Sequence, residues 1–305
     1  IFVKEYRNSS TLCTLNLSKN GEKSGVIIES TLETESPKNQ FEYKSDIDFT
    51  SPYVRVFSLL NKDYFFIHID DLEKYEYDKN AISKLIINEK SKSVLTKVFQ
   101  SKSSDYYGDF IKDKHGGLVV LAEGPPGVGK TSTAEVYAAQ QEKPLYIVQI
   151  NELGISSGRI ESKLMIIFER VQKWGAVLLF DEIDVFLYKR QDNLDQSAIV
   201  GVFLRLLDYF SGLIFFTTNR SEVLDPAVLS RISLKIKYES LDEKAQLQIW
   251  KSKLDDAGLT IDSLILLPKM NLNGRQIKNA IRISKIIYGT ELKEIEVKEL
   301  LEDYM

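Results

Sequence analysis

From residue 116 onward, short hydrophobic runs alternate with longer amphipathic stretches. Strands that are buried on both faces of a parallel sheet show such uninterrupted apolar runs, and the intervening stretches are long enough for crossover helices. This part of the chain therefore predicts an α/β fold, with a parallel sheet covered by helices on both faces. The four runs are Leu118–Leu121, Leu145–Val148, Val177–Phe180 and Leu213–Phe216.

Residues 1–70 carry a β-rich pattern instead. The dipeptide Asn20-Gly21, typical of tight hairpin turns, separates two short apolar segments. Residues 29–51 are rich in Ser, Thr, Glu and Lys without an apolar period, and they predict a mobile loop or a long insertion. We expect the aromatic side chains of the last strand to lie in the core. The predicted strands cover residues 12–17, 26–28, 53–57 and 64–69.

Residues 71–104 combine a charged connector with one amphipathic segment. Asn88 is a suitable N-cap for a helix that carries Val94, Leu95, Val98 and Phe99 on one apolar face, which we expect to be buried. This stretch therefore predicts a linker and a helix between the β-rich module and the α/β part.

After about residue 239 the strand pattern stops and helical periodicity takes over. Ser240 and Glu243 have the spacing of a capping box, and Asn273 is a suitable cap for a second helix. The C-terminal part is predicted to be a small helical unit. We divide the chain into residues 1–70 (β-rich N-terminal module), 71–104 (linker and helix), 105–239 (α/β subdomain) and 240–305 (helical subdomain).

Composition and charge narrow the class of protein. The 305 residues hold 40 Lys and Arg against 44 Asp and Glu, a formal net charge of −4 that disfavours a protein coating nucleic acid. The single cysteine, Cys13, excludes an intramolecular disulfide, and with two histidines it leaves no His/Cys zinc cluster. No uninterrupted apolar stretch reaches 18 residues, so we expect no transmembrane helix. The expectation is a cytoplasmic protein without a membrane partner.

A phosphate-binding motif follows the first hydrophobic run and precedes a helical stretch that begins near Ser132. In this context the glycines let backbone N–H groups surround phosphate oxygens, and the helix N-terminus adds partial positive charge. Lys130 has the reach for the β and γ phosphates of ATP, and the Thr131 hydroxyl suits Mg²⁺. The residues that match G-x-x-x-x-G-K-[ST] are Gly124, Pro125, Pro126, Gly127, Val128, Gly129, Lys130 and Thr131.

Two carboxylates, Asp181 and Glu182, end the third hydrophobic run. If that strand lies near the phosphate loop, Asp181 is placed to orient Mg²⁺ through its water shell. Glu182 is then placed to polarise or deprotonate an attacking water. The pair predicts nucleotide hydrolysis and not binding alone.

These motifs resemble the signature set of the AAA family within the AAA+ ATPases. The likeness is specific over about residues 105–290, and it is strongest to a poorly characterised group common in fungi with bacterial relatives. It implies an αβα subdomain with a five-stranded parallel sheet, a helical lid, and assembly into rings, usually hexamers. The resemblance rests on Gly124–Thr131, Asp181–Asp184 with Arg190, Thr217–Arg220, Val202–Leu207 and Asn273–Ile277.

The resemblance also assigns three further residues. Asn219 matches sensor 1, which helps position the water and reads the γ-phosphate. Arg231 matches the arginine finger that enters the neighbouring subunit's site, and Arg275 matches sensor 2 of the lid. Many AAA proteins have two arginines in R-x-x-R spacing, whereas Ser230-Arg231-Ile232 resembles the single-finger arrangement of clamp loaders. The adenine pocket is expected around Phe110-Ile111 and the lid.

One family feature is missing from the segment after the second hydrophobic run. In protein-threading AAA rings this segment carries an aromatic residue that grips substrate, but Asn151–Arg159 contains none, and Ile155 is the apolar candidate for that position. We therefore expect the N-terminal module to bind an unidentified protein partner. The predicted function is Mg²⁺-dependent ATP hydrolysis in a homo-oligomeric ring that remodels a macromolecule. A nucleotide-gated scaffold and a nucleic-acid-linked or defence ATPase stay open as alternatives.

Overall fold

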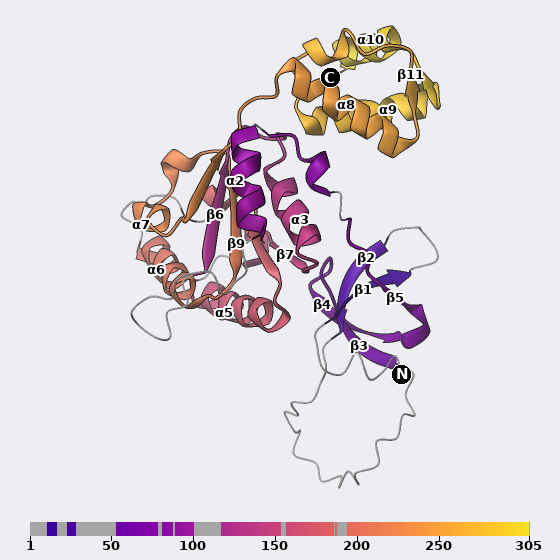
Figure 1. Cartoon of the computed structure of the whole chain (residues 1–305). Coiled ribbons are helices and arrows are strands. Elements are labelled where there is room, and N and C mark those ends of the chain that lie inside the picture. Colours follow the sequence, from indigo (N-terminus) through magenta and orange to yellow (C-terminus); the bar gives the residue numbers. More distant parts are fainter. Residues whose placement is uncertain are drawn as a thin grey trace.

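The computed structural model describes residues 11–16, 23–28, 53–78, 81–87, 89–100, 117–153, 157–185, 187 and 194–304. Figure 1 shows three parts along the chain: a small β-sheet module in indigo, an α/β subdomain from magenta to orange, and a helical unit in yellow. The hairpin turn at Asn20-Gly21 and the loop at 29–51 lie outside the described residues, as do Asn88, Phe110-Ile111, His115, Ile155 and Arg190.

The N-terminal module is a five-stranded antiparallel sheet with strand order β4-β3-β2-β1-β5. A single 3₁₀ turn, η1 at Ile69–Asp71, separates β4 from β5, which pairs with β1 at the other end of the order. Residues 72–74, expected within the charged connector, therefore belong to this sheet. The strands are β1 (Thr11–Asn16), β2 (Lys23–Ile28), β3 (Tyr53–Ser58), β4 (Asp63–His68) and β5 (Leu72–Lys74).

The aromatic strand β4 corrects a prediction about the core. Phe57 of β3 is fully buried, but Phe65 and Phe66 of β4 are 40% and 74% exposed. Neighbouring residues of a strand point to opposite faces, so two adjacent exposed rings mean that neither face is covered at this place. The expectation that this whole strand packs in the core was therefore wrong for Phe65 and Phe66.

The α/β subdomain is built on a five-stranded parallel sheet with strand order β10-β6-β9-β8-β7. Four strands coincide with the four predicted hydrophobic runs. The fifth, β10, alternates between exposed and buried positions and lies at one edge. The strands are β6 (Leu118–Glu123), β7 (Leu145–Val148), β8 (Val177–Phe180), β9 (Leu213–Thr218) and β10 (Leu234–Lys237).

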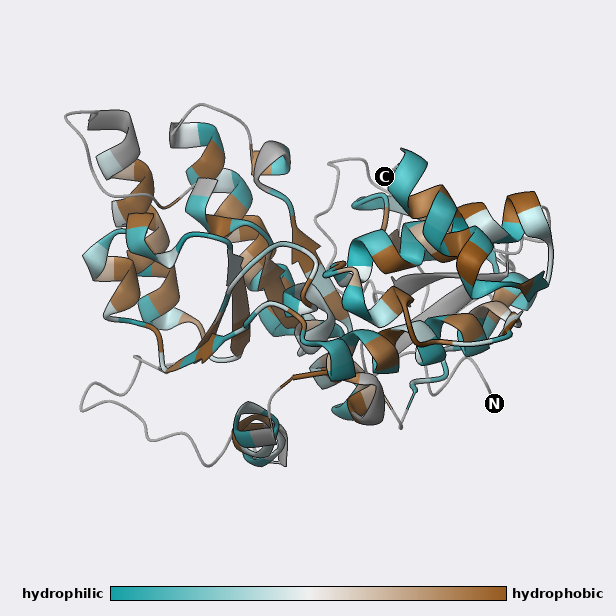
Figure 2. Ribbon diagram, turned by 90° about the horizontal axis from the view of Figure 1, so that it is seen from above, coloured by the Kyte–Doolittle hydropathy of each residue, from teal (hydrophilic) through white to brown (hydrophobic). Residues whose placement is uncertain are grey.

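Alternate side chains of this sheet pack on opposite faces. One face packs against α2 and α3, and the other against α5 and α6. The helices show the hydrophobic and hydrophilic bands that such one-sided burial requires (Figure 2). In α2 the predicted core residue Leu95 is buried, whereas Val94 is exposed, contrary to expectation. The longer helices are α2 (Glu89–Gln100), α3 (Lys130–Gln140), α5 (Ser157–Trp174) and α6 (Leu194–Tyr209).

Shorter elements connect these strands and helices. They leave the carboxyl ends of β6, β8 and β9 facing a common edge, which is where ligands bind in open α/β sheets. These connections are η2 (Ala81–Lys84), α4 (Ile150–Leu153), η4 (Ile183–Val185), η5 (Ser221–Val223) and α7 (Pro226–Leu229).

The C-terminal unit has its own core around Trp250, which is fully buried. It also holds two strands that the sequence pattern did not reveal, because each is only two residues long and pairs with the other in parallel. The prediction that strands stop after residue 239 was therefore wrong. The elements are α8 (Glu243–Ala257), β11 (Thr260–Ile261), η6 (Leu267–Lys269), α9 (Gly274–Tyr288), β12 (Glu291–Leu292) and α10 (Glu294–Tyr304).

The caps of two helices in this unit test the capping predictions. Asn273 caps α9 in a complete capping box with Gln276, as its position predicted. For α8 the expected pair Ser240 and Glu243 was wrong, because the N-cap is Asp242, whose side chain accepts a hydrogen bond from Ala245 N at 2.7 Å. Both Ser240 and Asp242 carry a capping oxygen, and the structure uses the one adjacent to the helix.

Candidate active site

The predicted phosphate loop connects β6 to α3 and opens onto a cavity of about 980 Å³. Gly124, Gly127 and Gly129 have φ angles of +148°, +74° and +97°, which L side chains rarely adopt. These angles bend the chain tightly before α3 begins. Residues 126–132 of the loop and the helix start line the cavity, so backbone N–H groups and the helix N-terminus meet there.

Lys130 connects the phosphate loop to the neighbouring strand β9. Its Nζ donates to the carbonyl oxygens of Gly124 at 2.8 Å and Pro125 at 2.5 Å, and to Asn219 Oδ1 at 2.8 Å. Burial lowers the pKa of Lys130, and the carboxylates of Asp181 and other nearby acids oppose that shift. The lysine is thus a buried cation held at the carboxyl ends of two adjacent strands.

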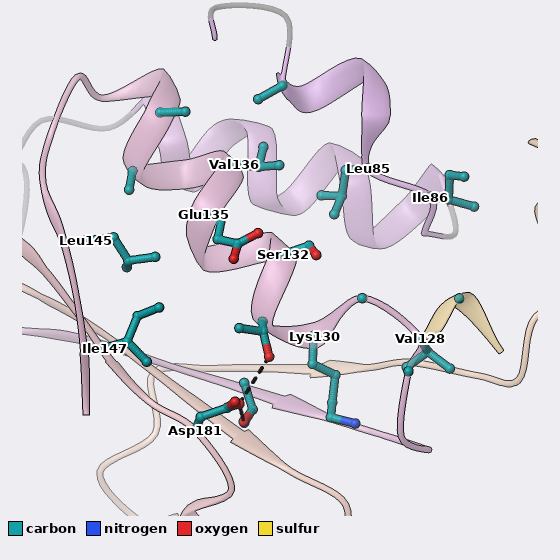
Figure 3. Close-up of a pocket in the computed structure, with 18 of the residues that line it drawn as sticks. Leu85, Ile86, Val128, Lys130, Ser132, Glu135, Val136, Leu145, Ile147 and Asp181 are labelled. Atoms are coloured by element: carbon teal, nitrogen blue, oxygen red, sulfur yellow. Dashed lines mark hydrogen bonds between the residues drawn. The ribbon is translucent and has the colours of Figure 1, made fainter. Parts of the chain in front are cut away.

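The acidic residue Asp181 connects α3 to β8 and β9. Its Oδ1 accepts hydrogen bonds from Thr131 Oγ1 at 3.1 Å and from Thr217 Oγ1 at 2.5 Å. Oxygen donors from a carboxylate and a hydroxyl suit Mg²⁺, so the residues at this place fit that cation. Figure 3 shows Asp181 and Lys130 beneath the first turn of α3.

Glu182 lies beside this network in an unusual backbone conformation. Its φ is +55°, in the left-handed region that is uncommon for residues other than glycine. The N–H of Glu182 donates to Thr217 Oγ1 at 2.9 Å, and the residue lines the cavity. A strained conformation held by a specific hydrogen bond is typical of residues whose side chain must face a site.

Thr217 is the residue that the motif analysis missed. It is only 1% exposed, and its hydroxyl donates to Asp181 while it accepts from the Glu182 backbone. Because β9 lies between β6 and β8, Thr217 supports both acidic residues from the central strand. Thr217 belongs to the motif Thr217–Arg220, but the spacing of that motif does not identify the partners of its hydroxyl.

Hydrophobic walls flank the phosphate loop on both sides of α3. Figure 3 shows Leu145 and Ile147 on one side and Leu85 and Ile86 on the other. The segment around Leu85 therefore forms part of a wall suited to a planar base, whereas the adenine pocket was expected around Phe110-Ile111, outside the described residues.

The helical unit contributes to the same cavity. Gly274 N, at the start of α9, donates to Gly127 O at 2.9 Å, so the two units touch at the phosphate loop. Arg275 lines the cavity from the first turn of α9. The predicted sensor residues Asn219 and Arg275 are thus brought to one cavity with Lys130, from β9 and from the helical unit.

Arg231 is placed differently, outside the lining of this cavity. Its guanidinium pairs with Asp208 at the end of α6, and its Nη1 donates to Ala227 O at 3.1 Å. The hydrogen bond with Asp208 is the main cause that raises the pKa of Arg231. The structure therefore separates this one candidate residue from the others within a single chain.

Comparison with known proteins gives one family match and several relatives, each similar to part of this chain. Residues 120–240 match the family model described as "ATPase family associated with various cellular activities (AAA)". A Lon protease homolog of Acanthamoeba polyphaga mimivirus is 28% identical over 78% of this chain and 26% of that protein. No helix in the described part of the chain is long and apolar enough to cross a membrane.

Two further relatives match shorter stretches. An uncharacterized AAA family ATPase, y4kL, of Sinorhizobium fredii is 35% identical over 35% of this chain and 34% of that protein. A probable inactive ATP-dependent zinc metalloprotease, FTSHI 1, of Arabidopsis thaliana chloroplasts is 34% identical over 46% of this chain and 17% of that protein. The chain spans about a third or less of the length of these relatives. With the phosphate loop and the acidic pair in place, the chain carries an ATPase domain of the AAA family, within the AAA+ proteins.

Proposed function

We propose that this chain hydrolyses ATP with Mg²⁺ and uses the energy, in a homo-oligomeric ring, to remodel a protein partner. The observation that supports hydrolysis most directly is the network Lys130–Asn219 and Thr131–Asp181–Thr217 at the carboxyl ends of three adjacent strands. One relative is named inactive, so the intact set of side chains is the relevant evidence for this chain.

Each residue has a distinct role in this proposal. The ammonium of Lys130 binds the β and γ phosphates, and Asn219 holds that ammonium and orients the attacking water. Thr131 and Asp181 would hold Mg²⁺, which when bound neutralises charge on the phosphates. Glu182 takes the proton of the water. Preorganised charges of this kind supply most of the rate, because they need no rearrangement during the reaction.

Arg231 acts across a subunit interface in this proposal. Because it lies outside the cavity of its own chain, it reaches a γ-phosphate only if a second copy presents its cavity to it. Asp208 fixes the guanidinium plane and leaves N–H groups of Nη1 and Nη2 for phosphate oxygens. This requirement for a partner copy supports assembly into a ring, with a hexamer as the proposed number.

The N-terminal module is the proposed partner-binding part. Binding segments often lie on loops held by a rigid scaffold, and this module provides a separate sheet beside the ATPase subdomain. The net charge of −4 makes nucleic acid the less favoured partner.

The test compares Glu182→Gln with Lys130→Ala. Glu182→Gln keeps the side-chain shape but cannot take a proton, so it should bind ATP, hydrolyse it at least about 100-fold more slowly, and accumulate the assembled ring. Lys130→Ala should lose ATP binding. Turnover is measured by phosphate release and assembly by light scattering. Wild-type turnover in Glu182→Gln would overturn the mechanism, and ATP-driven assembly with no turnover in the wild type would favour the scaffold alternative.

A further inference from the structure

Two helices from different units begin at the same loop. Gly129 is the N-cap of α3, and Asn273 is the N-cap of α9. The two starting points touch, because Gly274 N donates to Gly127 O at 2.9 Å and a Cβ added to Gly127 would lie 2.6 Å from Asn273 Oδ1. The helical unit therefore meets the ATPase subdomain at the phosphate loop.

Two oppositely charged residues, one on each helix, lie at similar distances from the starts of α3 and α9. Glu135 is five residues beyond the first residue of α3, and Lys278 is four residues beyond the first residue of α9. At 1.5 Å per residue, they lie roughly 7.5 Å and 6 Å from the shared starting point. Both side chains line the cavity, and Figure 3 shows Glu135 projecting into it from α3. The two charged groups thus line the same cavity at similar distances from the contact between the units.

Lys278 is one of two lysines whose charge acts on the Glu135 carboxylate. Partial burial and the charge of Asp181 raise the pKa of Glu135, while Lys278 and Lys253 act in the opposite direction. Lys253 already pairs with Asp256 at 2.8 Å. The side chains of Glu135 and Lys278 make no hydrogen bond or ion pair with another residue of the described part of the chain. Both side chains therefore line the cavity without a partner in direct contact among the described residues.

We propose that Glu135 and Lys278 form an ion pair when the helical unit closes over bound nucleotide, and that this clasp slows nucleotide release. The inference rests on the proposed function, since it takes the ligand of the cavity to be a nucleotide. It goes beyond the matched motifs, because neither residue belongs to the phosphate loop, the acidic pair or the sensor positions.

A charge-swap cycle tests the clasp. The measurement is the release rate of a fluorescent ATP analogue from wild type, Glu135→Lys, Lys278→Glu and the double variant. Each single reversal should speed release roughly fivefold, in the range of partly exposed ion pairs, and the double variant should return close to wild type. Arg282→Glu is the matched control, because Arg282 is exposed on α9 and does not line the cavity. Combining Arg282→Glu with Glu135→Lys should not return the release rate of the analogue to the wild-type value.

The outcomes separate the clasp from the proposed function. Suppose that the wild type binds the analogue and that the double variant releases it faster by the product of the two single fold-changes. The clasp is then wrong, and nucleotide binding stands. If the wild type does not bind the analogue at all, both are overturned.

A cross-linking experiment tests whether positions 135 and 278 come close together, and it does not rely on release rates. The chain has one native cysteine, Cys13, so a Cys13→Ser background is free of other thiols. Glu135→Cys combined with Lys278→Cys should form a disulfide faster when a non-hydrolysable ATP analogue is present. Glu135→Cys combined with Arg282→Cys should show no such acceleration. Equal rates with and without the analogue for the first pair would contradict closure at this position.

Discussion

Arg231 is held within its own chain by Asp208: Nε donates to Oδ1 at 2.8 Å, and Nη2 donates to Oδ2 at 3.1 Å. The two residues are 23 positions apart, Asp208 at the end of α6 and Arg231 just beyond α7. A bidentate pair fixes the plane of a guanidinium more firmly than a single bond does. The pair therefore determines in which direction the proposed finger points.

Arg231→Ala should leave ATP binding by single subunits intact and remove hydrolysis. The ion pair is partly exposed, so its loss should cost only about 1 kcal/mol or less of folding free energy. Mixing with Lys130→Ala subunits should restore some phosphate release, because Lys130→Ala contributes a finger and Arg231→Ala contributes an intact cavity. Mixed rings that form at several ratios without recovered activity would contradict a role across the interface.

Thr217→Val should weaken activation by Mg²⁺. Valine keeps the shape of the buried side chain, but it can neither donate to Asp181 nor accept from the Glu182 backbone. Loss of a group that supports a metal ligand typically costs about 10–100-fold in metal affinity or activity. Phosphate release measured against Mg²⁺ concentration should shift by about tenfold or more, and Thr217→Ser should behave like wild type. An unchanged Mg²⁺ dependence in Thr217→Val would show that Asp181 does not need this support.

Glu294 connects α10 to the segment before η6. The side chain is 2% exposed and accepts hydrogen bonds from Ser263 Oγ and from the backbone N–H groups of residues 265–267. Burial by itself raises the pKa of Glu294, but these hydrogen bonds outweigh it and hold the pKa below its usual value. The charged form is therefore the one that stabilises the folded helical unit.

Glu294→Gln should lower the free energy of unfolding by about 1–3 kcal/mol at pH 7. The reason is that the Ser263 hydroxyl and the N–H groups of residues 265–267 would then donate to a neutral amide and not to a carboxylate. Since the folded-state pKa is below the unfolded value of about 4.3, this contribution is complete above that pH and declines as pH falls through the folded-state pKa. Urea unfolding at pH 7 and near pH 3.5 should show the difference between wild type and Glu294→Gln shrinking at the lower pH. A constant difference would mean that the carboxylate charge does not contribute.

The sequence predicted those features that depend on local pattern. The four buried strands, the phosphate loop and the start of α9 at Asn273 each have a signature within a few residues, and the structure contains all of them. The strand pair β11 and β12 has no such signature, because two residues are too few to show a period. The cap at Asp242 was missed because Ser240 offers an equivalent oxygen two positions earlier.

Relationships between distant residues were not predictable from pattern. The pairing of Arg231 with Asp208 and the double role of Thr217 depend on which strands and helices become neighbours. Burial has the same limit: Phe57 and Phe66 stand in similar aromatic strands, yet one is fully buried and the other is 74% exposed. The difference arises because only Phe57 meets the ATPase subdomain.

That meeting point is an aromatic cluster between the N-terminal module and the ATPase subdomain. The ring of Phe57 lies 5.0 Å from that of Trp174 and 6.2 Å from that of Tyr146, between centroids. The Arg170 guanidinium carbon lies 4.4 Å from the Phe57 centroid, and Lys62 Nζ lies 4.0 Å from the Tyr146 centroid. Rings and cations in this arrangement attract each other beyond simple burial. The module is therefore docked on α5 and β7 and is not a loose attachment.

Phe57→Ala should cost about 3–5 kcal/mol of folding free energy, as large-to-small changes of buried aromatic residues do. Phe66→Ala is the matched control from the same hairpin and should change stability by no more than about 0.5 kcal/mol, because Phe66 is largely exposed. The chain has two tryptophans, so a Trp250→Phe background leaves Trp174 as the fluorescent reporter of docking. Its emission should shift to longer wavelength in Phe57→Ala as water reaches the ring. If emission and stability match those of Phe66→Ala, the module is not held by this cluster.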